Sequence, residues 1–426
     1  YGMKMNFKID ANCSYIEKKI KSLEKLTDED RPFTRLVFSK KFYEARSWLS
    51  EQFNLLGLSI STDEAGNLIG LLKANHETDK VVIVGSHIDT VPAGGCYDGT
   101  AGVVSGLCLI KHIKENNIEL PFNLAIYDYL GEELNEWGTS CIGSRGIAGV
   151  LNEEILLRQN SSGKILKDEI NKIGGNSELL NKPLPVVKNI LACLELHIEQ
   201  GKVLEERKID IGIVKSIPSI SRFKVSVSGQ AGHSGTILMN QRADALVSAS
   251  KIITFVNTLA LKISKNSNQH FVSTIGKIDV LPNSAAIIPG LVEMTIDLRA
   301  TSQNSRQEFI NILQEEITSM NNTDPCQINI DDIAFAPFVE MDKELISLFK
   351  TSSGSLGFSS NIMDSGAGHD TAQLSRVAPA AMIFIPCKDG LSHCPEEFAE
   401  ILDISKGTAV LYKMIENLAE LNVNAT

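Results

Sequence analysis

Short apolar runs alternate with amphipathic segments along most of this chain, and that alternation constrains the fold more than any other feature. The runs NLIGLLK, KVVIVGS, FNLAIYDYL and NILACLELH are typical of buried strands, whereas TAGVVSGLCLIKHIKEN is typical of a helix. Strands that alternate with helices favour a parallel sheet whose two faces are both covered. We therefore expect an α/β fold with a mostly parallel sheet, preceded by a helical region over residues 15–57.

Residues 214–338 follow a different order of elements, β-α-β-β-α-β, which is typical of a ferredoxin-like unit. The α/β alternation resumes after this region, with a helix near 342–350, the strand AAMIFIP and a final helix near 403–420. A larger α/β domain is therefore expected to begin before the ferredoxin-like unit and to finish after it.

The expected domain organisation has three segments. We place the first part of the catalytic domain at 1–213, the inserted domain at 214–330 and the second part of the catalytic domain at 331–426. A chain of 426 residues is longer than a typical single domain, which agrees with this division.

Composition excludes several classes of protein. A net charge of −11 argues against a nucleic-acid-binding surface. The sequence has no run of about 18 apolar residues, so no membrane span is expected. The eight cysteines are scattered and form no CxxC pair, which indicates reduced thiols in the cytoplasm rather than a disulfide framework or a thiolate metal site.

Polar side chains gather where the expected strands end. In open parallel sheets, ligands bind outside the carboxyl ends of the strands. Each of these residues taken singly is compatible with a solvated loop, but together they supply the mixture of nitrogen and oxygen ligands that zinc and similar ions prefer. The residues are His87, Asp89, Asp98, Glu132, Glu133, His197 and His393.

The spacing of these residues suggests different roles. Asp89 lies two positions after His87 and is suited to accept the second N–H of a metal-bound imidazole. Asp98 lies in a glycine-rich loop that allows a close approach to a metal, which favours it as a ligand. Adjacent residues point in different directions, so one of Glu132 and Glu133 can bind metal while the other acts as a general base. The residues alone leave that choice open.

Seven motifs along the chain carry a resemblance to a known family. They are GSHIDTVPAGGCYDG, GEE, ELHIEQGKVLE, GHSGT with RADAL, IPGLVEMTIDLRA, GAGHD and LSHCPEEF. In this order they resemble the hydantoinase/carbamoylase branch of the M20 di-zinc amidohydrolases, which includes N-carbamoyl-L-amino acid hydrolases, β-ureidopropionases and allantoate amidohydrolases. The resemblance covers about residues 30–415.

The resemblance implies two divalent metal ions that share one carboxylate. It assigns His87, Asp98 and His197 to one ion, and Asp98, Glu133 and His393 to the other. Glu132 becomes the general base. Zinc is the implied metal, with manganese, cobalt or nickel as alternatives because the same donors suit several divalent ions.

The resemblance also implies groups that read the substrate. The inserted domain is similar to a lid and dimerisation domain, so a homodimer is expected, with a small ureido or amide molecule as substrate. His233 resembles an imidazole that reaches the developing oxyanion, usually from the neighbouring subunit, and Arg299 resembles the guanidinium that grips the substrate carboxylate. Gln200, Gly368 and His369 complete the expected substrate contacts.

Three segments depart from the pattern of the branch. EELNEWGTSCIGSRGIAG stands where much of the branch continues with a G-S-R-F-type sequence. Ala286 replaces an asparagine before IPG, and Ile220-Ser221 replace a glutamine-arginine pair. Alanine and isoleucine cannot replace a lost hydrogen bond, which is typically worth about 1–3 kcal/mol of discrimination. The residues that the resemblance assigns to metal binding are all present, whereas several positions assigned to substrate recognition differ from the branch.

The expected function is metal-dependent hydrolysis of a linear C–N bond, in an N-carbamoyl-L-amino acid or a related ureido acid. The same metal pair would serve an M20-type dipeptidase or an N-acyl-amino acid deacylase. A further alternative is a binding protein that kept the fold and lost the chemistry. Such a protein should lack a ligand or the base, and none is missing from the sequence.

Overall fold

A computed structural model describes residues 7–267 and 269–424. The chain divides into two compact units. The first unit extends to Lys215 and includes Glu340–Met363 and the chain from His369 onward, and the second holds Ser216–Val339 and Asp364–Gly368. The boundary expected at residue 330 lies inside a strand, Gln327–Ala336, and the second unit extends to Val339, close to the end of the β-α-β-β-α-β pattern at residue 338.

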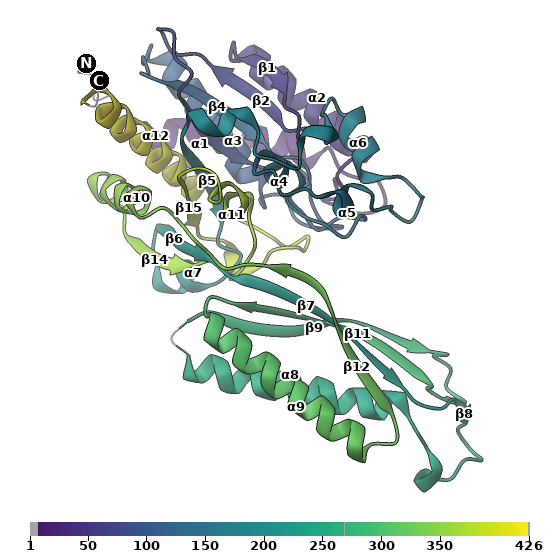
Figure 1. Ribbon diagram of the computed structural model, residues 1–426. Helices are drawn as coiled ribbons and strands as arrows, with labels where there is room; N and C mark the ends of the chain where they lie inside the picture. Colours follow the sequence, from purple (N-terminus) through teal and green to yellow (C-terminus); the bar gives the residue numbers. More distant parts are fainter. Residues whose placement is uncertain (1–6, 268, 425–426) are drawn as a thin grey trace. The chain divides into compact units, whose positions relative to one another are not determined.

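A nine-stranded sheet forms the centre of the first unit (Figure 1). Its strand order is β1-β2-β4-β3-β5-β15-β6-β13, and β14 pairs with β6. The strands are β1 (Ser59–Thr62), β2 (Leu68–Leu72), β3 (Val81–Ser86), β4 (Asn123–Asp128), β5 (Ile190–Ile198), β6 (Ile211–Ile217), β13 (Val339–Glu340), β14 (Ser360–Asp364) and β15 (Ala380–Ile385).

The sheet is mixed, and its four central strands, β4, β3, β5 and β15, are parallel to one another. The pairs β4-β3, β3-β5 and β5-β15 are parallel, whereas β1-β2, β2-β4 and β15-β6 are antiparallel. The expectation of a mostly parallel sheet therefore holds for the four central strands, and the antiparallel pairs β1-β2, β2-β4 and β15-β6 depart from it. The short connection from β1 to β2 cannot form the crossover that a parallel pair requires.

Helices cover both faces of this sheet. Neighbouring residues of a strand point to opposite faces, and in β5 the Glu195 carboxylate accepts a hydrogen bond from Thr371 of α11 while the Leu196 side chain lies against Gly407 of α12. The helices of this unit are α1 (Ile9–Glu24), α2 (Lys40–Leu55), α3 (Thr100–Glu115), α4 (Ile142–Ile147), α5 (Glu153–Leu156), α6 (Leu166–Lys172), α7 (Val203–Arg207), α10 (Lys343–Ser355), α11 (Asp370–Leu374) and α12 (Ile401–Asn424).

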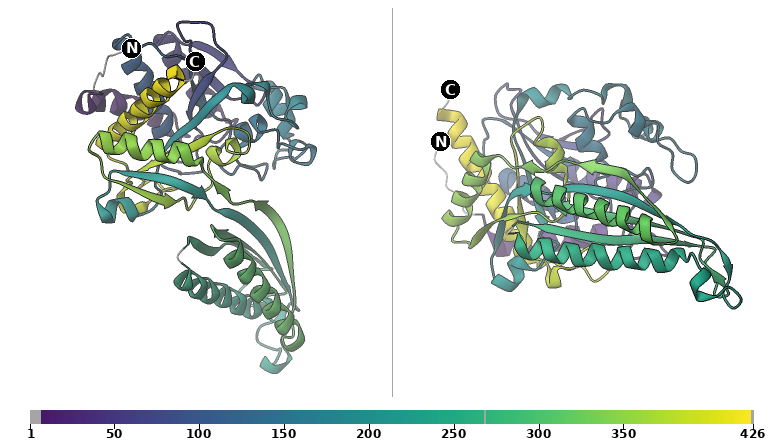
Figure 2. Two further views of the ribbon diagram at one scale, coloured as in Figure 1. Left: turned by 60° about the vertical axis from the view of Figure 1, so that its left-hand side comes forward. Right: turned by 60° about the horizontal axis from the view of Figure 1, so that its bottom comes forward.

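The second unit is a four-stranded antiparallel sheet with two long helices. Its strand order is β12-β7-β11-β9, and Figures 1 and 2 show both helices along one face of this sheet. Buried side chains of the helices and the sheet form one core, which includes Ile252, Met294 and Phe309. The elements are β7 (Ser219–Ser228), α8 (Ala245–Asn266), β9 (Phe271–Leu281), β11 (Leu291–Ala300), α9 (Gln303–Thr323) and β12 (Gln327–Ala336), with a short pair β8 (Gly232–His233) and β10 (Ile287–Ile288).

Helix α8 is long and apolar enough to be compared with a membrane span. Its 22 residues have a mean hydropathy of 1.4 over the best window, so by length and composition it could cross a membrane. Its buried side chains, Ala249, Ile252 and Val256 among them, belong to the core of the second unit. Asp244 caps its first turn by accepting the backbone N–H groups of Leu246 and Val247. In this structure α8 is a core helix.

Candidate metal centre

Four adjacent parallel strands bring the expected ligands to one edge of the sheet. His87 directly follows β3, Glu132 and Glu133 follow β4, His197 lies near the end of β5, and His393 follows β15. Because the carboxyl ends of β4, β3, β5 and β15 lie at the same edge, these side chains converge there.

Hydrogen bonds fix the orientation of two buried imidazoles. Nδ1 of His87 lies 3.0 Å from the carbonyl oxygen of Asp89, and Nδ1 of His197 lies 2.9 Å from the carbonyl oxygen of Ile198. A carbonyl only accepts, so each Nδ1 carries the proton and each Nε2 presents a lone pair. Nε2 of His87 is buried and has no hydrogen-bond partner. Such an atom is suited to bind a metal ion.

Asp98 stands between three imidazoles. Its Oδ1 lies 3.4 Å from Nε2 of His87 and 3.1 Å from Nε2 of His197, and its Oδ2 lies 3.3 Å from Nε2 of His393. The two carboxylate oxygens therefore face two different sets of ligands. This is the arrangement that a carboxylate bridging two ions requires.

Glu133 completes the second set, because its Oε1 lies 3.2 Å from Nε2 of His393. Ligands about 2.0–2.1 Å from a tetrahedral zinc ion are about 3.3 Å from one another. The ligand atoms of His87, Asp98 and His197 all lie within 4.8 Å of one another, and so do those of Asp98, Glu133 and His393. The residues present thus fit two metal ions, with the grouping that the resemblance implies.

A third group of donors, Glu195, His197 and His369, also lies close together. The oxygens of Glu195 already accept hydrogen bonds from the hydroxyls of Ser86 and Thr371. His197 belongs to the first set through its Nε2. This group therefore packs next to the first set of ligands and helps to position it.

The Asp89 carboxylate was expected to accept a hydrogen bond from the imidazole of His87, but in the structure it accepts backbone N–H groups. Its two oxygens accept the backbone N–H groups of Glu132 and Glu133, at 3.2 and 3.1 Å, and it is the Asp89 carbonyl that accepts from His87. The carboxylate lies 3.6 Å from Nδ1 of His87. A single residue thus positions both the first imidazole and the glutamate pair.

Glu132 lies beside the first ligand set. Its Oε2 is 3.6 Å from Nε2 of His87, and the thiol of Cys141 lies 3.6 Å from its Oε1. Burial raises the pKa of Glu132 well above its usual range, although His87 opposes the shift. A buried carboxyl beside the ligands that holds a proton readily is suited to general acid–base chemistry.

The charges of the cluster are arranged for cations. Burial alone would raise the pKa of Asp98, but the three surrounding imidazoles hold that pKa well below its usual range. Contacts with Asp98 and Glu133 raise the pKa of His393 to about 11. The site therefore favours positive charge at its centre.

The loop that carries Asp98 depends on a residue that the sequence interpretation missed. Oε1 of Glu397 accepts the backbone N–H groups of Tyr97 and Asp98, at 2.7 and 3.0 Å. The Ser392 hydroxyl lies 2.7 Å from Oε2 of Glu397 and 2.9 Å from Oδ2 of Asp98. The motif LSHCPEEF contains both residues, but nothing in its spacing indicates contact with a loop about three hundred positions earlier.

Gly99 is required immediately after Asp98. Its φ of +61° lies in the left-handed region, and a Cβ at this position would lie 2.4 Å from Nε2 of His87. Its N–H lies 3.1 Å from Nε2 of His197. The glycine lets the start of α3 approach both imidazoles.

Two of the expected substrate contacts lie in the first unit. Gln200 donates from Nε2 to Oδ2 of Asp98 at 2.6 Å, and its Oε1 is buried without a hydrogen-bond partner. His369 is buried, with its ring 4.6 Å from that of His197 and 5.6 Å from that of Phe384. In this structure both side chains pack around the ligands.

The remaining expected contacts lie in the second unit. His233 is exposed on β8, and its Nδ1 accepts the N–H of Gly235 at 3.0 Å, so the neutral ring carries its proton on Nε2. Arg299 donates to Asp297 at 2.9 Å and to the carbonyl oxygen of Gly366 at 3.1 Å. Gly368 lies in the short segment Asp364–Gly368 of the same unit.

The positions that depart from the branch pattern have structural partners. The carbonyl oxygen of Ala286 accepts the N–H of Ser234, next to His233, at 3.1 Å. The Ser221 hydroxyl accepts a hydrogen bond from Arg306 at 2.8 Å. At these positions the chain uses backbone and hydroxyl groups to stabilise the second unit.

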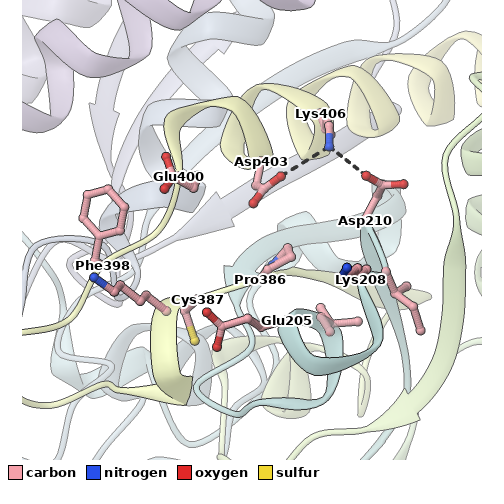
Figure 3. A pocket seen from close by; sticks show the side chains of 12 residues that line it. Glu205, Lys208, Asp210, Pro386, Cys387, Phe398, Glu400, Asp403 and Lys406 are labelled. Atoms are coloured by element: carbon pink, nitrogen blue, oxygen red, sulfur yellow. Dashed lines mark hydrogen bonds and ion pairs between the residues drawn. The ribbon is translucent and has the colours of Figure 1, made fainter.

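A cavity of about 480 Å³ elsewhere in the first unit contains none of the candidate residues (Figure 3). At its edge Lys406 donates to Asp210 at 2.7 Å and to Asp403 at 3.4 Å. This pairing leaves no unbalanced charge on Lys406 for a ligand. The candidate residues of the first unit lie instead at the strand ends.

Comparison with known proteins identifies the family of the chain and agrees with the fold. Residues 83–417 match peptidase family M20/M25/M40, and the chain belongs to this family. The resemblance found in the sequence is confirmed.

Several relatives within the family are named amidohydrolases. The chain is 34% identical over 389 residues to N-carbamoyl-L-amino-acid amidohydrolase from Pseudomonas sp. (strain NS671), covering 91% of this chain and 93% of the relative. It is 32% identical to allantoate amidohydrolase from Bacillus subtilis (strain 168), covering 92% and 93%. The crystal structure of an amidase of the hydantoinase/carbamoylase family from Burkholderia vietnamiensis superposes with a TM-score of 0.85 at 27% identity, covering 97% and 99%.

Proposed function

We propose that this chain is a metal-dependent hydrolase that cleaves a C–N bond of an N-carbamoyl-L-amino acid or a related ureido acid. The observation that carries the proposal is Asp98, whose two oxygens face two separate sets of donors with Glu132 beside them. The names of the relatives, amidohydrolases of N-carbamoyl amino acids and of allantoate, supply the substrate class.

His87, Asp98 and His197 would hold one divalent ion, and Asp98, Glu133 and His393 the other. Zinc suits these nitrogen and oxygen donors, as manganese, cobalt and nickel also do. When bound, the two ions would supply Lewis acidity, which lowers the pKa of water and polarises a carbonyl oxygen.

Glu132 moves the proton in the proposed reaction. Its carboxylate takes a proton from water, and the water oxygen forms a bond with the ureido carbon. The same carboxyl then gives its proton to the departing nitrogen as the C–N bond breaks. An N-carbamoyl amino acid is thereby converted into the amino acid and carbamic acid, which decomposes to ammonia and carbon dioxide. The raised pKa of Glu132 suits this transient storage of a proton.

The second unit is assigned to substrate recognition. We propose that it is a ferredoxin-like lid and dimerisation domain, and the element order from β7 to β12 supports this. His233, with its proton on Nε2, would donate to the oxyanion, and Arg299 would bind the substrate carboxylate through its fork of N–H groups. All eight cysteines are unpaired, which supports the proposal of a cytoplasmic enzyme.

Metal removal and restoration test the proposal. Chelated protein should release no ammonia from N-carbamoyl-L-amino acids, and added zinc should restore the release. Glu132→Gln should retain two bound ions by elemental analysis and lose at least about 10²-fold in kcat, whereas Glu29→Gln, at an exposed glutamate, should match wild type. Full activity after complete chelation, or turnover of dipeptides and N-acyl amino acids alone, would overturn it.

A further inference from the structure

The side chain of Cys141 lies against Glu132, the proposed general base. Its thiol donates to Oε1 of Glu132 at 3.6 Å, and its backbone N–H donates to the carbonyl oxygen of Glu132 at 2.9 Å. Both residues are buried. Cys141 belongs to the stretch EELNEWGTSCIGSRGIAG, which departs from the branch pattern, so the resemblance assigns no role to this thiol.

The two carboxylate oxygens of Glu132 have different neighbours. Oε2 lies 3.6 Å from Nε2 of His87 and therefore faces the first set of ligands, whereas Oε1 faces the Cys141 thiol. The backbone N–H of Glu132 donates to the Asp89 carboxylate at 3.2 Å. The main chain of Glu132 is thus held at its N–H and at its carbonyl, and the thiol restrains the rotation of the carboxylate.

The backbone brings the thiol to this place. The N–H groups of residues 141, 142 and 143 donate to the carbonyl oxygens of residues 132, 131 and 130, at 2.9, 3.0 and 2.8 Å. These three hydrogen bonds connect the start of α4 to the segment that follows β4. The position of Cys141 is therefore tied to the position of the glutamate pair.

Cys141 also has an unusual backbone conformation. Its φ of +54° and ψ of +43° lie in the left-handed region, which glycine adopts without steric cost and other residues do not. Residues held in such conformations cluster at functional sites, where the surrounding structure maintains the strain. Glycine would be the less strained residue here, so the strained cysteine directs attention to what its thiol contacts, which is Glu132.

We propose that Cys141 is a positioning residue for Glu132, whose Oε1 it holds so that Oε2 stays directed toward the ligands. The inference rests on the proposed function, because it takes Glu132 as the group that moves the proton. A thiol is a weak donor, so its removal should misorient the carboxylate without abolishing the reaction. The bond is made to the proposed base and not to a substrate-binding residue, so the loss should appear in kcat and not in KM.

The kinetic test uses Cys141→Gly, which removes the thiol and accepts the left-handed backbone without strain. The substrate is whichever of N-carbamoyl-L-alanine and allantoate the zinc-loaded wild type hydrolyses faster. In Cys141→Gly, kcat should fall by about tenfold while KM stays within about twofold of wild type. Cys141→Ser keeps a donor on a shorter side chain and should recover part of the lost kcat.

Two control variants separate the thiol from its backbone. Cys108→Ala removes another buried thiol, in α3, and should match wild type in kcat and in KM. Asn117→Gly relieves the same kind of left-handed backbone at an exposed residue, where φ is +50°, and should match wild type as well. A change confined to the Cys141 variants is therefore an effect of the contact with Glu132.

Infrared spectroscopy tests that contact without turnover. The S–H stretching band of Cys141 is the band that Cys141→Gly removes from the wild-type spectrum, and a hydrogen bond lowers the frequency of such a band. Glu132→Ala removes the acceptor, so the band should move to higher frequency. Glu29→Ala, at an exposed glutamate, should leave the band in place.

The outcomes distinguish the two proposals. A lower kcat with unchanged KM in Cys141→Gly, together with a shifted band in Glu132→Ala, supports both. Release of ammonia by wild type with an unchanged kcat in Cys141→Gly, or an unmoved band in Glu132→Ala, overturns the role of Cys141 and leaves the hydrolase. A raised KM or a loss of bound zinc in Cys141→Gly would reveal a general disturbance of the site and also overturns that role. No ammonia from either substrate overturns the hydrolase itself, and a shifted band would then report a structural contact alone.

Discussion

At the scale of a single residue, Glu397 positions part of the proposed metal centre, although it belongs to neither set of ligands. It fixes the backbone of Tyr97 and Asp98 and shares the Ser392 hydroxyl with Asp98. Groups that orient ligands commonly contribute 10–100-fold to metal affinity. The carboxylate of Glu397 thus sets where Asp98 lies.

Glu397→Ala is therefore expected to weaken zinc binding by about 10–100-fold. Competition with a chromophoric chelator measures the affinity directly, with no need for turnover. The adjacent exposed Glu396 provides the matched control, and Glu396→Ala should bind zinc as wild type does. Equal affinities for the two variants would refute the role of Glu397.

Asp63 gives a pH dependence that is independent of the metal centre. Burial raises the pKa of Asp63 to about 6 from an ordinary value of 3.8, against opposing hydrogen bonds from Asn67 and Ala65. Since the folded state favours the protonated carboxyl, its stabilising contribution is complete below about pH 4 and is lost as the pH rises through 6.

The free energy of unfolding of wild type relative to Asp63→Asn is thus expected to fall by about 2–3 kcal/mol between pH 4 and pH 7. Urea unfolding of both proteins at several pH values measures the difference. Asp279→Asn, at an exposed aspartate, should show no such trend. A difference that stays constant with pH would contradict the expectation.

At the scale of elements, α3 lies unusually close to the sheet. A Cβ at Gly102 would lie 2.3 Å from the carbonyl oxygen of Leu196 in β5, a contact with backbone that cannot move aside. Gly354, in α10, has no atom within 4 Å of the same position. A side chain at Gly102 would thus collide with the sheet, whereas a side chain at Gly354 would meet open space.

Gly102→Ala is expected to destabilise the protein by several kcal/mol, since it separates α3 from β5. Gly354→Ala should instead stabilise it by about 0.5–1 kcal/mol, because alanine restricts the unfolded chain and favours a helix. Urea unfolding of both variants gives the sign of each change. The same sign in both would show that the close approach of α3 has no energetic weight.

How far the sequence predicts these elements depends on local apolar pattern. The strands β3, β5 and β15 were predicted because each is a short apolar run. Strand β1 was not predicted, because all four of its residues are exposed and it therefore contains no apolar run. The helical region over 15–57 is in fact α1 and α2 separated by turns that Arg35 stabilises through its hydrogen bond to the distant carbonyl of Ile88, which no local pattern indicates.

The residues of the candidate site likewise divide into those that the local sequence pattern predicted and those that only the structure revealed. His87, Asp98 and His393 stand beside strand ends, so the rule for parallel sheets brought them together from the sequence alone. The role of Glu397 depends on a contact across most of the chain and therefore required the structure. The Asp89 carboxylate was assigned to the imidazole, whereas backbone N–H groups of the next strand end occupy it.

At the scale of the whole molecule, each unit has its own buried core. Phe309 belongs to the core of the second unit, and Phe349 of α10 is equally buried in the first. Units with separate cores commonly unfold as separate cooperative transitions. Calorimetry of the zinc-loaded protein is therefore expected to show two.

Phe309→Ala and Phe349→Ala should each remove about 3–5 kcal/mol and shift different transitions. Chelation should lower the transition that Phe349→Ala lowers, because the ligands belong to the first unit. Phe309→Ala should leave the zinc content unchanged. If both variants and the chelator shift one common transition, the units unfold together.

The position of His393 after the inserted unit has a consequence for biosynthesis. The second set of ligands is incomplete until β15 has left the ribosome, by which time the whole inserted unit has been made. A chain truncated before β15 would keep His87, Asp98 and His197 but would lack His393. Such a chain could not complete the second proposed set of ligands, so only a chain synthesised past residue 393 could hold both ions.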